Sequence, residues 1–280
     1  MTALYVTLGA LGALLLLSLL ILFLIAPARG RKARRQEVLD HIFAHRGFFD
    51  NANGVPENSM TAFRRAVEAG YGIETDIHLS RDGIAVLHHD DSLKRICGVD
   101  ALLREKTAEE LSAIRLLGTE DTVPRFSDFL RLVDGKVPLV LELKEEAGNS
   151  AALVARVMKE LEGYEGPYCI ESFDPRVLYQ LRKQAPHVIR GQLAGRINRG
   201  KKLSTRLVDF ALSRLLFNVI ARPDFVAYRY GDRDIKAFRL CTSVLGATRV
   251  YWTLRSRAEY DGALADGGAP IFEGFVPEEK

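Results

Sequence analysis

The chain has 280 residues, 48% of them hydrophobic, and its 39 basic and 36 acidic residues leave a formal net charge of +3. The length suits one domain of roughly 240 to 250 residues plus an appendage, because single α/β barrels reach that size. The small charge, with no basic face, argues against a nucleic-acid partner. Cys97, Cys169 and Cys241 are odd in number and lack CxxC spacing, which argues against disulfides or structural zinc and favours reduced thiols.

The amino-terminal segment has the composition of a membrane-spanning helix. Residues 1–28 contain no Asp, Glu, Lys or Arg, and an apolar run extends from Ala3 to Ile25. At about 1.5 Å per residue, this run can cross a hydrocarbon layer of roughly 30 Å. The alternative is a cleaved signal peptide with Ala26-Pro27-Ala28 as its cleavage site, but the front lacks basic residues and the apolar stretch is long. We therefore predict a transmembrane anchor over residues 1–28.

A basic cluster follows this segment directly. Residues 29–40 are charged and contain few large apolar groups, which predicts a juxtamembrane linker that can lie against anionic headgroups. Positive residues stay on the cytoplasmic side of a membrane helix, so the cluster predicts a single-pass cell-membrane protein with a cytoplasmic domain over residues 41–280. The basic residues of the cluster are Arg29, Arg31, Lys32, Arg34 and Arg35.

From His41 onward, short β-type runs alternate with helix-type segments. One predicted helix covers Ser59 to Ala69, with Asn58 in the N-cap position and Gly70 just past its end. Alternating β and α segments imply a parallel sheet, and eight repeats imply a closed TIM (β/α)8 barrel. The predicted strands are Ile42–His45, Gly72–Ile77, Val137–Leu143, Tyr168–Ser172, Val188–Leu193, Asp224–Arg229, Arg249–Leu254 and Pro270–Phe275.

Two segments depart from this alternation. The run Ile84 to His88 follows the second strand after only Ser80 to Gly83, which is too short for a parallel crossover and predicts a hairpin. The segment Leu203 to Arg222 has a broad apolar face with interspersed basic residues. It is interpreted either as an outer barrel helix or as a helix that faces the membrane or gates the substrate.

Acidic residues stand at the ends of two neighbouring barrel strands. Glu74 and Asp76 are two apart on one strand, so both carboxylates point to the same side of the sheet. Glu142 occupies the corresponding end of the next barrel strand. Acids on strands are commonly solvated or ion-paired, but three at the mouth of such a barrel form an oxygen-rich cage suited to Mg²⁺ or Ca²⁺.

Basic residues and histidines accompany these acids. Lys144 shares the face of Glu142, where it pairs with a carboxylate or stabilises charge on a phosphoryl group. His45 and Arg46 end the first strand, and a histidine beside an arginine suits acid/base chemistry on an anion. His88 and His89 supply a second candidate, of which one can face inward. Glu57 is a possible addition to the metal shell or simply stabilises a helix N-terminus, and His78 is interpreted as structural.

Six motifs in order resemble the glycerophosphodiester phosphodiesterase family. They are Ala44-His45-Arg46-Gly47, Pro56-Glu57-Asn58-Ser59, Glu74-Thr75-Asp76, Asp82-Gly83, His89-Asp90 with Leu93 and Arg95, and Leu141-Glu142-Leu143-Lys144. Ser172-Phe173-Asp174 and Trp252-Thr253 look like later motifs of that family. The resemblance thus covers most of the chain from His41 onward and excludes the apolar amino-terminal segment.

The resemblance implies a TIM barrel with a divalent cation held by Glu74, Asp76 and Glu142. It implies that His45 and His89, rather than His88, form the acid/base pair, with Arg46 and Lys144 near the phosphate. The reaction it implies begins with attack of the substrate's glycerol hydroxyl on phosphorus and ends with hydrolysis of the cyclic phosphate, giving glycerol phosphate and an alcohol.

The chain departs from the family at the eighth strand, where it reads Pro270-Ile271-Phe272-Glu273-Gly274-Phe275, so the contacts near Glu273 are not predicted. Two alternatives to hydrolysis of soluble glycerophosphodiesters stay open. One is lysophospholipase D-type cleavage of lipid-borne diesters. The other is a barrel that binds lipid headgroups without catalysis, which would be expected to have lost the ligands found here.

Overall fold

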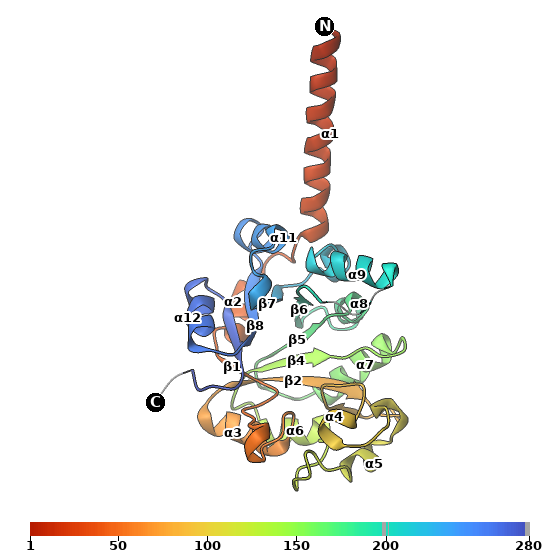
Figure 1. Cartoon of the computed structure of the whole chain (residues 1–280), viewed down its shortest axis with the longest axis vertical. Coiled ribbons are helices and arrows are strands. Elements are labelled where there is room, and N and C mark those ends of the chain that lie inside the picture. Colours follow the sequence, from red (N-terminus) through yellow and green to blue (C-terminus); the bar gives the residue numbers. More distant parts are fainter. Residues whose placement is uncertain (198–199, 201, 278–280) are drawn as a thin grey trace.

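The computed structural model describes residues 1–197, 200 and 202–277, and it contains a closed barrel of eight parallel strands (Figure 1). Hydrogen bonds join neighbours in the order β1, β2, β4, β5, β6, β7, β8 and β9, and β9 pairs with β1. The predicted TIM (β/α)8 barrel is therefore confirmed. Its strands are β1 Phe43–His45, β2 Gly72–Leu79, β4 Leu139–Leu143, β5 Tyr168–Ser172, β6 Ile189–Ala194, β7 Phe225–Arg229, β8 Thr248–Leu254 and β9 Ala269–Phe272.

Helices surround the barrel and connect its strands (Figure 1). The α-helices that follow β1 in the chain are α3 Met60–Ala69, α4 Lys94–Cys97, α5 Ala108–Ser112, α6 Phe126–Val133, α7 Ser150–Glu160, α8 Pro175–Gln184, α9 Leu203–Ser213, α10 Asn218–Ala221, α11 Lys236–Arg239 and α12 Arg257–Ala265. The segment 203–222, predicted as one helix, is thus divided into α9 and α10. The final residues of the predicted domain, 278–280, lie outside the described part of the chain.

The predicted hairpin after β2 is confirmed. The strand β3, Ala85–Leu87, pairs antiparallel with the far end of β2, where His78 lies opposite Val86. Residues between β3 and α6 then form a small apolar cluster of their own around Leu103 and Leu111. This excursion holds the segment that contains His88 and His89 beside the carboxyl ends of the strands.

The barrel interior is closed at its amino end by a helix that the sequence did not reveal. Helix α2, Lys32–Leu39, places Val38 and Leu39 in one cluster with the interior side chains of Phe43 and Phe225. Burial of two such side chains stabilises the barrel by roughly 1.5 to 3 kcal/mol each. Part of the segment predicted as a juxtamembrane linker, residues 29–40, is thus helical, and its two apolar residues fill the end of the barrel.

Two arginines of the basic cluster, one just before α2 and one within it, also bind the barrel. Arg31 donates to the carbonyl oxygens of Pro186 and Val188 and pairs with the buried carboxylate of Asp224 at 2.7 Å. Arg34 donates to the carbonyl oxygen of His187. These arginines thus bind backbone and carboxylate groups at the amino end of the barrel, and contact of the cluster with lipid headgroups stays a prediction.

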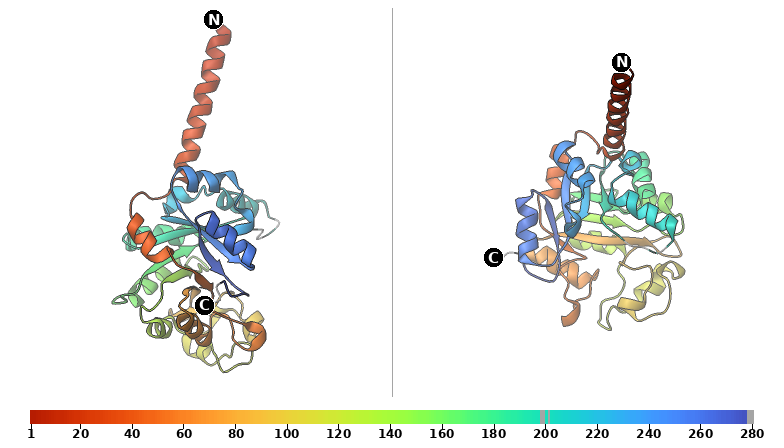
Figure 2. Two further views of the ribbon diagram at one scale, coloured as in Figure 1. Left: turned by 90° about the vertical axis from the view of Figure 1, so that its left-hand side faces the viewer. Right: turned by 45° about the horizontal axis from the view of Figure 1, so that its top comes forward.

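Helix α1, Thr2–Ile25, projects from the domain (Figures 1 and 2), and it is long and apolar enough to cross a membrane. A signal sequence would have the same properties. Its last residue, Ile25, is fully buried, and the carbonyl oxygen of Ile25 accepts from Asn218 of α10 at 2.9 Å. Arg222 donates to the carbonyl oxygens of Phe23 and Ala26 and lies over the Phe23 ring. The end of α1 is therefore docked against the side of the barrel.

Candidate active site

Three acidic side chains converge at the carboxyl ends of β2 and β4. Asp76 and Glu142 are direct neighbours in the parallel pairing of these strands, and Glu74 lies two residues before Asp76 on the same face. All three side chains are buried, and each offers an oxygen atom within 4.8 Å of the others. The period of two along β2 and the pairing of β2 with β4 are enough to create this cluster.

The surroundings of these carboxylates affect their charge. Burial, together with repulsion from Asp76, raises the pKa of Glu74 well above its usual range, and burial likewise raises that of Glu142. Burial opposes ionisation of Asp76 too, but Lys144, His89 and Arg46 hold its pKa well below the usual range. Full ionisation of all three carboxylates is therefore opposed by burial and by their mutual repulsion, and a bound cation would remove that opposition.

Two cationic side chains lie within the cluster. The Lys144 ammonium bridges Asp76 at 2.9 Å and Glu142 at 2.8 Å. The Arg46 backbone N–H donates to Glu74 at 3.1 Å, and its guanidinium lies 3.5 Å from Asp76. Of the two possibilities open for Lys144, the structure shows the ion pair with carboxylates. Both cations also border the mouth of the barrel, where an anionic substrate would enter.

A fourth carboxylate, Glu171, was missed in the sequence. It lies on β5 directly beside Glu142, is fully buried, and burial raises its pKa well above the usual range. Its Oε2 atom has no hydrogen-bond partner within the described structure. The signal was available, since Glu171 stands one residue before the Ser172-Phe173-Asp174 motif, but its inward direction depends on the pairing of β5 with β4.

His45 forms a short hydrogen bond with Glu273, the residue whose contacts the sequence left unpredicted. Strand β9 ends at Phe272, three residues earlier than predicted, so Glu273 lies just beyond the strand at the mouth. His45 Nδ1 lies 2.5 Å from Glu273 Oε2, and Arg255 pairs with the other carboxylate oxygen at 2.6 Å. Burial lowers the pKa of His45, although Glu273 opposes this shift. The arrangement directs Nε2 towards Glu74, 3.8 Å away.

His89 has an equivalent carboxylate partner next to it in the chain. Its Nδ1 atom lies 2.6 Å from Asp90, which in turn accepts from Arg95 at 2.6 Å. Glu57 accepts from Arg95 through both of its oxygen atoms and from Arg46 at 2.7 Å. Glu57 thus links Arg46, which follows His45, to Arg95, which holds the carboxylate partner of His89. A contribution of Glu57 to a metal shell remains a prediction.

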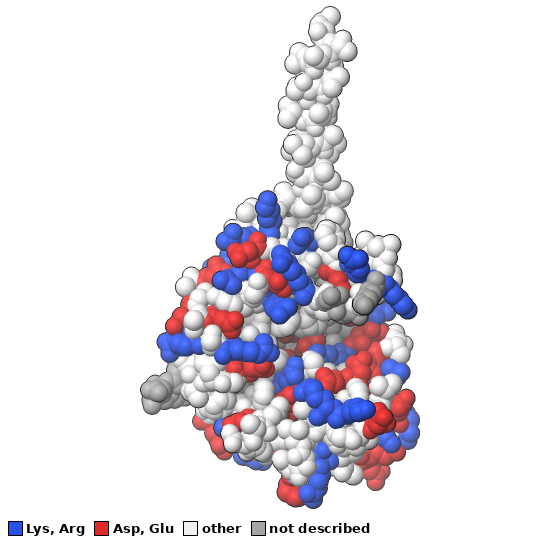
Figure 3. Space-filling model, viewed as in Figure 1, with Lys and Arg blue, Asp and Glu red and all other residues white. Residues whose placement is uncertain are grey.

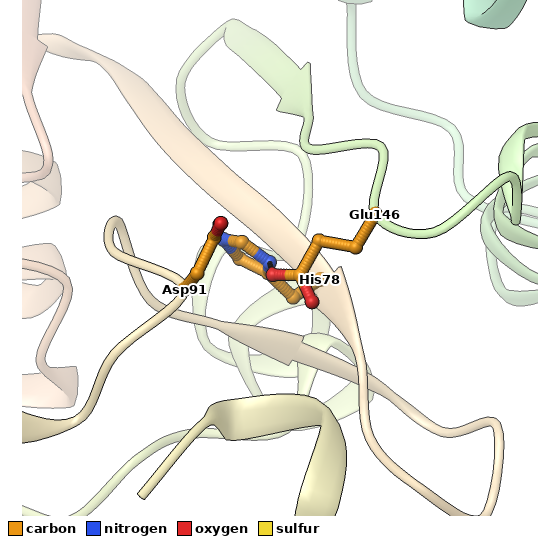
Figure 4. Close-up of side chains that lie close together, drawn as sticks. All are labelled: His78, Asp91 and Glu146. Carbon is orange, nitrogen blue, oxygen red and sulfur yellow. Dashed lines mark ion pairs between the residues drawn. The ribbon is translucent and has the colours of Figure 1, made fainter. Parts of the chain in front are cut away.

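The other two histidines of this region lie behind the mouth. His88 is buried, and burial lowers its pKa to about 4. His78 extends from β2 between Glu146, 2.8 Å from Nδ1, and the carbonyl oxygen of His89, 3.3 Å from Nε2. Figure 4 shows His78 converging with Asp91 and Glu146, which come from the loops after β3 and β4. This cluster supports the backbone of His89, in line with the structural interpretation of His78.

Asn58 differs from its predicted role. Ser59, not Asn58, caps helix α3 by accepting from the Ala62 backbone N–H. Asn58 has a φ of 53° in the left-handed region, which Asn tolerates better than most residues. This conformation turns its amide inward, where it donates to Asp76 at 2.9 Å and accepts from Thr75 at 2.7 Å. The side chain that was expected to cap the start of a helix therefore orients a candidate metal ligand.

These groups surround a cavity of about 300 Å³ at the mouth of the barrel. One part of its wall is charged and includes His45, Glu74, His89, Glu142 and Lys144. The other part is apolar and comes from β5, β6, β8 and the residues that follow them. Its members are Phe173, Leu193, Ile197 and Trp252, and Ile271 of β9 adds a further apolar side chain to the lining.

Comparison with known proteins identifies the family. Residues 45–230 match the model of the glycerophosphoryl diester phosphodiesterase family. The chain belongs to this family. The predicted enzyme class, a phosphoric diester hydrolase, is confirmed with it. Among curated relatives, the glycerophosphodiester phosphodiesterase of Caldanaerobacter subterraneus subsp. tengcongensis is 29% identical over 66% of this phosphodiesterase and 79% of the relative.

Other relatives bear on substrate and fold. The human lysophospholipase D GDPD1 is 31% identical over 53% of this phosphodiesterase and 46% of its own length. A phosphodiesterase of Oleispira antarctica, solved in complex with the product sn-glycerol-3-phosphate, superposes with a TM-score of 0.68 at 21% identity. The superposition covers 84% of this chain and 93% of the Oleispira antarctica chain. At that identity the likeness establishes the fold, and the roles of individual residues rest on the geometry above.

Proposed function

We propose that this phosphodiesterase hydrolyses glycerophosphodiesters to glycerol phosphate and an alcohol, using a divalent cation and two histidines. One observation supports this most strongly. Three buried carboxylates, Glu74, Asp76 and Glu142, lie in the same cavity as His45 and His89, and each histidine is held by its own acid. A barrel that only binds headgroups would not need this combination.

The carboxylates fit a hard cation such as Mg²⁺ or Ca²⁺. Both ions prefer oxygen ligands, and all three candidate ligands are carboxylates. The raised pKa of Glu74 and of Glu142 reflects burial and repulsion among like charges, which a divalent cation would relieve. When bound, the cation would supply Lewis-acid stabilisation of charge on the phosphoryl oxygens. We therefore assign Glu74, Asp76 and Glu142 as its ligands.

The two histidines have different environments, which suggests their order of use. Burial keeps the pKa of His45 low, so this ring is neutral near pH 7 and can accept the proton of the attacking glycerol hydroxyl through Nε2. His89 is more exposed and can donate a proton to the oxygen of the departing alcohol. A bond forms between the glycerol oxygen and phosphorus while the bond to the alcohol breaks, and hydrolysis of the cyclic phosphate follows with the roles reversed.

Arg46 and Lys144 are proposed to bind the phosphate. Both line the cavity beside the histidines. Glu57 already orients Arg46, and Glu142 already orients Lys144. These side chains therefore lose little further conformational entropy when they bind an anion. Preorganised cations of this kind stabilise negative charge that grows on non-bridging oxygens.

Membrane attachment and a lipid-borne substrate are also proposals. Helix α1 supports a single-pass anchor, and a cytoplasmic domain follows from the basic residues after it. Arg31 and Arg34 bind the barrel, so the cytoplasmic orientation of the domain is supported chiefly by other basic residues of the cluster, Arg29 and Lys32. Cleavage of a lysophospholipid is favoured as a second substrate class by the apolar wall of the cavity and by the human relative's name.

The test is a substrate panel on the full chain in detergent. We expect release of choline from glycerophosphocholine, or of another alcohol from a similar diester, with Mg²⁺, Mn²⁺ or Ca²⁺. Chelation should abolish the release, and return of the cation should restore it. Absence of turnover with every soluble diester and every lysophospholipid under all three cations would refute the proposal.

A further inference from the structure

Helix α9 carries an apolar stripe on its outer side. Leu203, Leu207 and Phe210 follow the spacing of one helical face, and their exposed fractions are 70%, 61% and 54%. The opposite face, with Asp209, Leu212 and Ser213, is buried against the domain. Large apolar side chains that occur singly on a surface need no explanation, but a continuous stripe indicates an interaction surface.

Three basic residues of α9 and its two ends flank the stripe. Lys202 and Arg206 are exposed, Arg214 lies over the Phe210 ring at 5.2 Å, and the one acid within α9, Asp209, is buried. Figure 3 shows many basic side chains, with acidic ones among them, around the end of the domain from which α1 emerges. An apolar stripe flanked by Lys and Arg suits the interfacial layer of a membrane that contains anionic lipid.

The docking of α1 places this stripe near the membrane. Helix α10, which follows α9 closely in the chain, contacts α1 directly through Asn218 and Ile25. Figures 1 and 2 show α9 at the end of the domain from which α1 emerges. Ile220 of α10 and Val244, after α11, add further exposed apolar surface. If α1 spans a bilayer, this end of the domain faces that bilayer.

The lining of the catalytic cavity is more apolar on one side than on the other. Most of the apolar lining comes from β5, β6 and β8 and the residues just after them, although Glu171 of β5 and Arg255 after β8 are ionisable and Ile271 of β9 is apolar. Ile197, in that apolar lining, precedes the start of α9 at Leu203 by six residues in the sequence. The charged wall of the cavity comes chiefly from β1, β2 and β4. Figure 1 shows β5 and β6 nearer to α1 than β2. A diester with an acyl chain could therefore place its phosphate among the charged groups and its apolar part towards α9.

We propose that the apolar stripe of α9, with Ile220 and Val244, rests in the bilayer interface and orients the cavity to receive phosphodiesters that are carried by lipids. This inference rests on the proposed hydrolase function and on the membrane anchor. It assigns α9 a role in the choice of substrate that leaves the chemistry at phosphorus unchanged. The partner is the lipid surface itself.

Depth in the bilayer can be measured with the full chain in nanodiscs of brominated phosphatidylcholine and phosphatidylserine, one chain in each disc. Trp252 is the single native tryptophan, so its signal is a constant background. We expect bromine to quench the added fluorescence of Leu207→Trp strongly. The matched control is Leu264→Trp, at another exposed leucine on α12, and its added fluorescence should stay unquenched. Equal quenching at the two positions, or the absence of quenching at both, would overturn the proposal.

Activity gives an independent test. The double variant Leu207→Ser/Phe210→Ser should lose roughly tenfold in kcat/KM for a lysophospholipid in the same discs, which corresponds to about 1.4 kcal/mol. Its turnover of soluble glycerophosphocholine, and both activities of Leu264→Ser, should be unchanged. Equal loss on both substrates would overturn the assigned role. If the wild type cleaves neither substrate, the proposed function fails while the quenching result still decides the position of α9.

Discussion

Replacement of Glu273 by Gln should reduce catalysis because it removes the charge that holds His45. The contacts of Glu273 with its neighbours lower its pKa from 4.5 to about 2, against the opposing effect of burial. This difference corresponds to about 3 kcal/mol of favourable interaction. His45 at 2.5 Å is the main partner, since Arg255 is largely exposed. If most of this energy holds the ring in its reactive orientation, kcat should fall by about a hundredfold.

The pH profile of the same variant gives a second readout. The Glu273 carboxylate favours the protonated ring, so its removal should lower the pKa of His45 further. The acid limb of the kcat/KM profile, which reports the base of the free enzyme, should move to lower pH. Arg255→Gln removes the other partner of Glu273 and should change kcat by less than about threefold. If Glu273→Gln keeps more than a third of the wild-type kcat, our reasoning on His45 is wrong.

Two further predictions concern the histidine pair and acid stability. His89→Asn should lower kcat by a factor of about 10² to 10⁴ in a diester assay. His88→Asn should chiefly lower the midpoint of thermal unfolding, because His88 is buried behind the mouth of the barrel. Equal losses of kcat in the two variants would contradict the assignment of His89 as the catalytic histidine. Glu57 has a pKa lowered to about 2 despite its burial, so its stabilisation, about 3 kcal/mol, is present above pH 4.5 and disappears as the pH falls towards 2. Glu57→Gln should therefore lower the midpoint of thermal unfolding at pH 7 by about 6 °C or more. The difference from wild type should vanish in acid. A difference that stays constant across pH would contradict the stabilisation assigned to the Glu57 carboxylate.

Strand periodicity predicted much of the barrel and its acidic centre. Glu74 and Asp76 share a face because they are two apart on one strand, and the same rule placed Lys144 with Glu142. The short Ser80 to Gly83 connection excluded a parallel crossover, which predicted the hairpin of β3. These predictions depend only on local geometry, so a single sequence was sufficient for them.

The missed features depend on contacts between distant segments. Glu171 became part of the acidic cluster only through the pairing of β5 with β4. Glu273 reached His45 because β9 ends at Phe272 rather than continuing. Helix α2 looked like a charged linker because just Val38 and Leu39 carry its packing, and two apolar residues give too weak a periodic signal to predict a docked helix.

The central claim is that Glu74, Asp76 and Glu142 hold the cation on which hydrolysis depends, and one measurement tests it most directly. Diester turnover by wild type and by Glu74→Gln/Asp76→Asn should be compared over a titration with Mg²⁺ and Ca²⁺, with circular dichroism as the check on folding. We predict saturable activation of the wild type and no activation of the folded double variant at any concentration. Equal activation of both proteins would contradict the account.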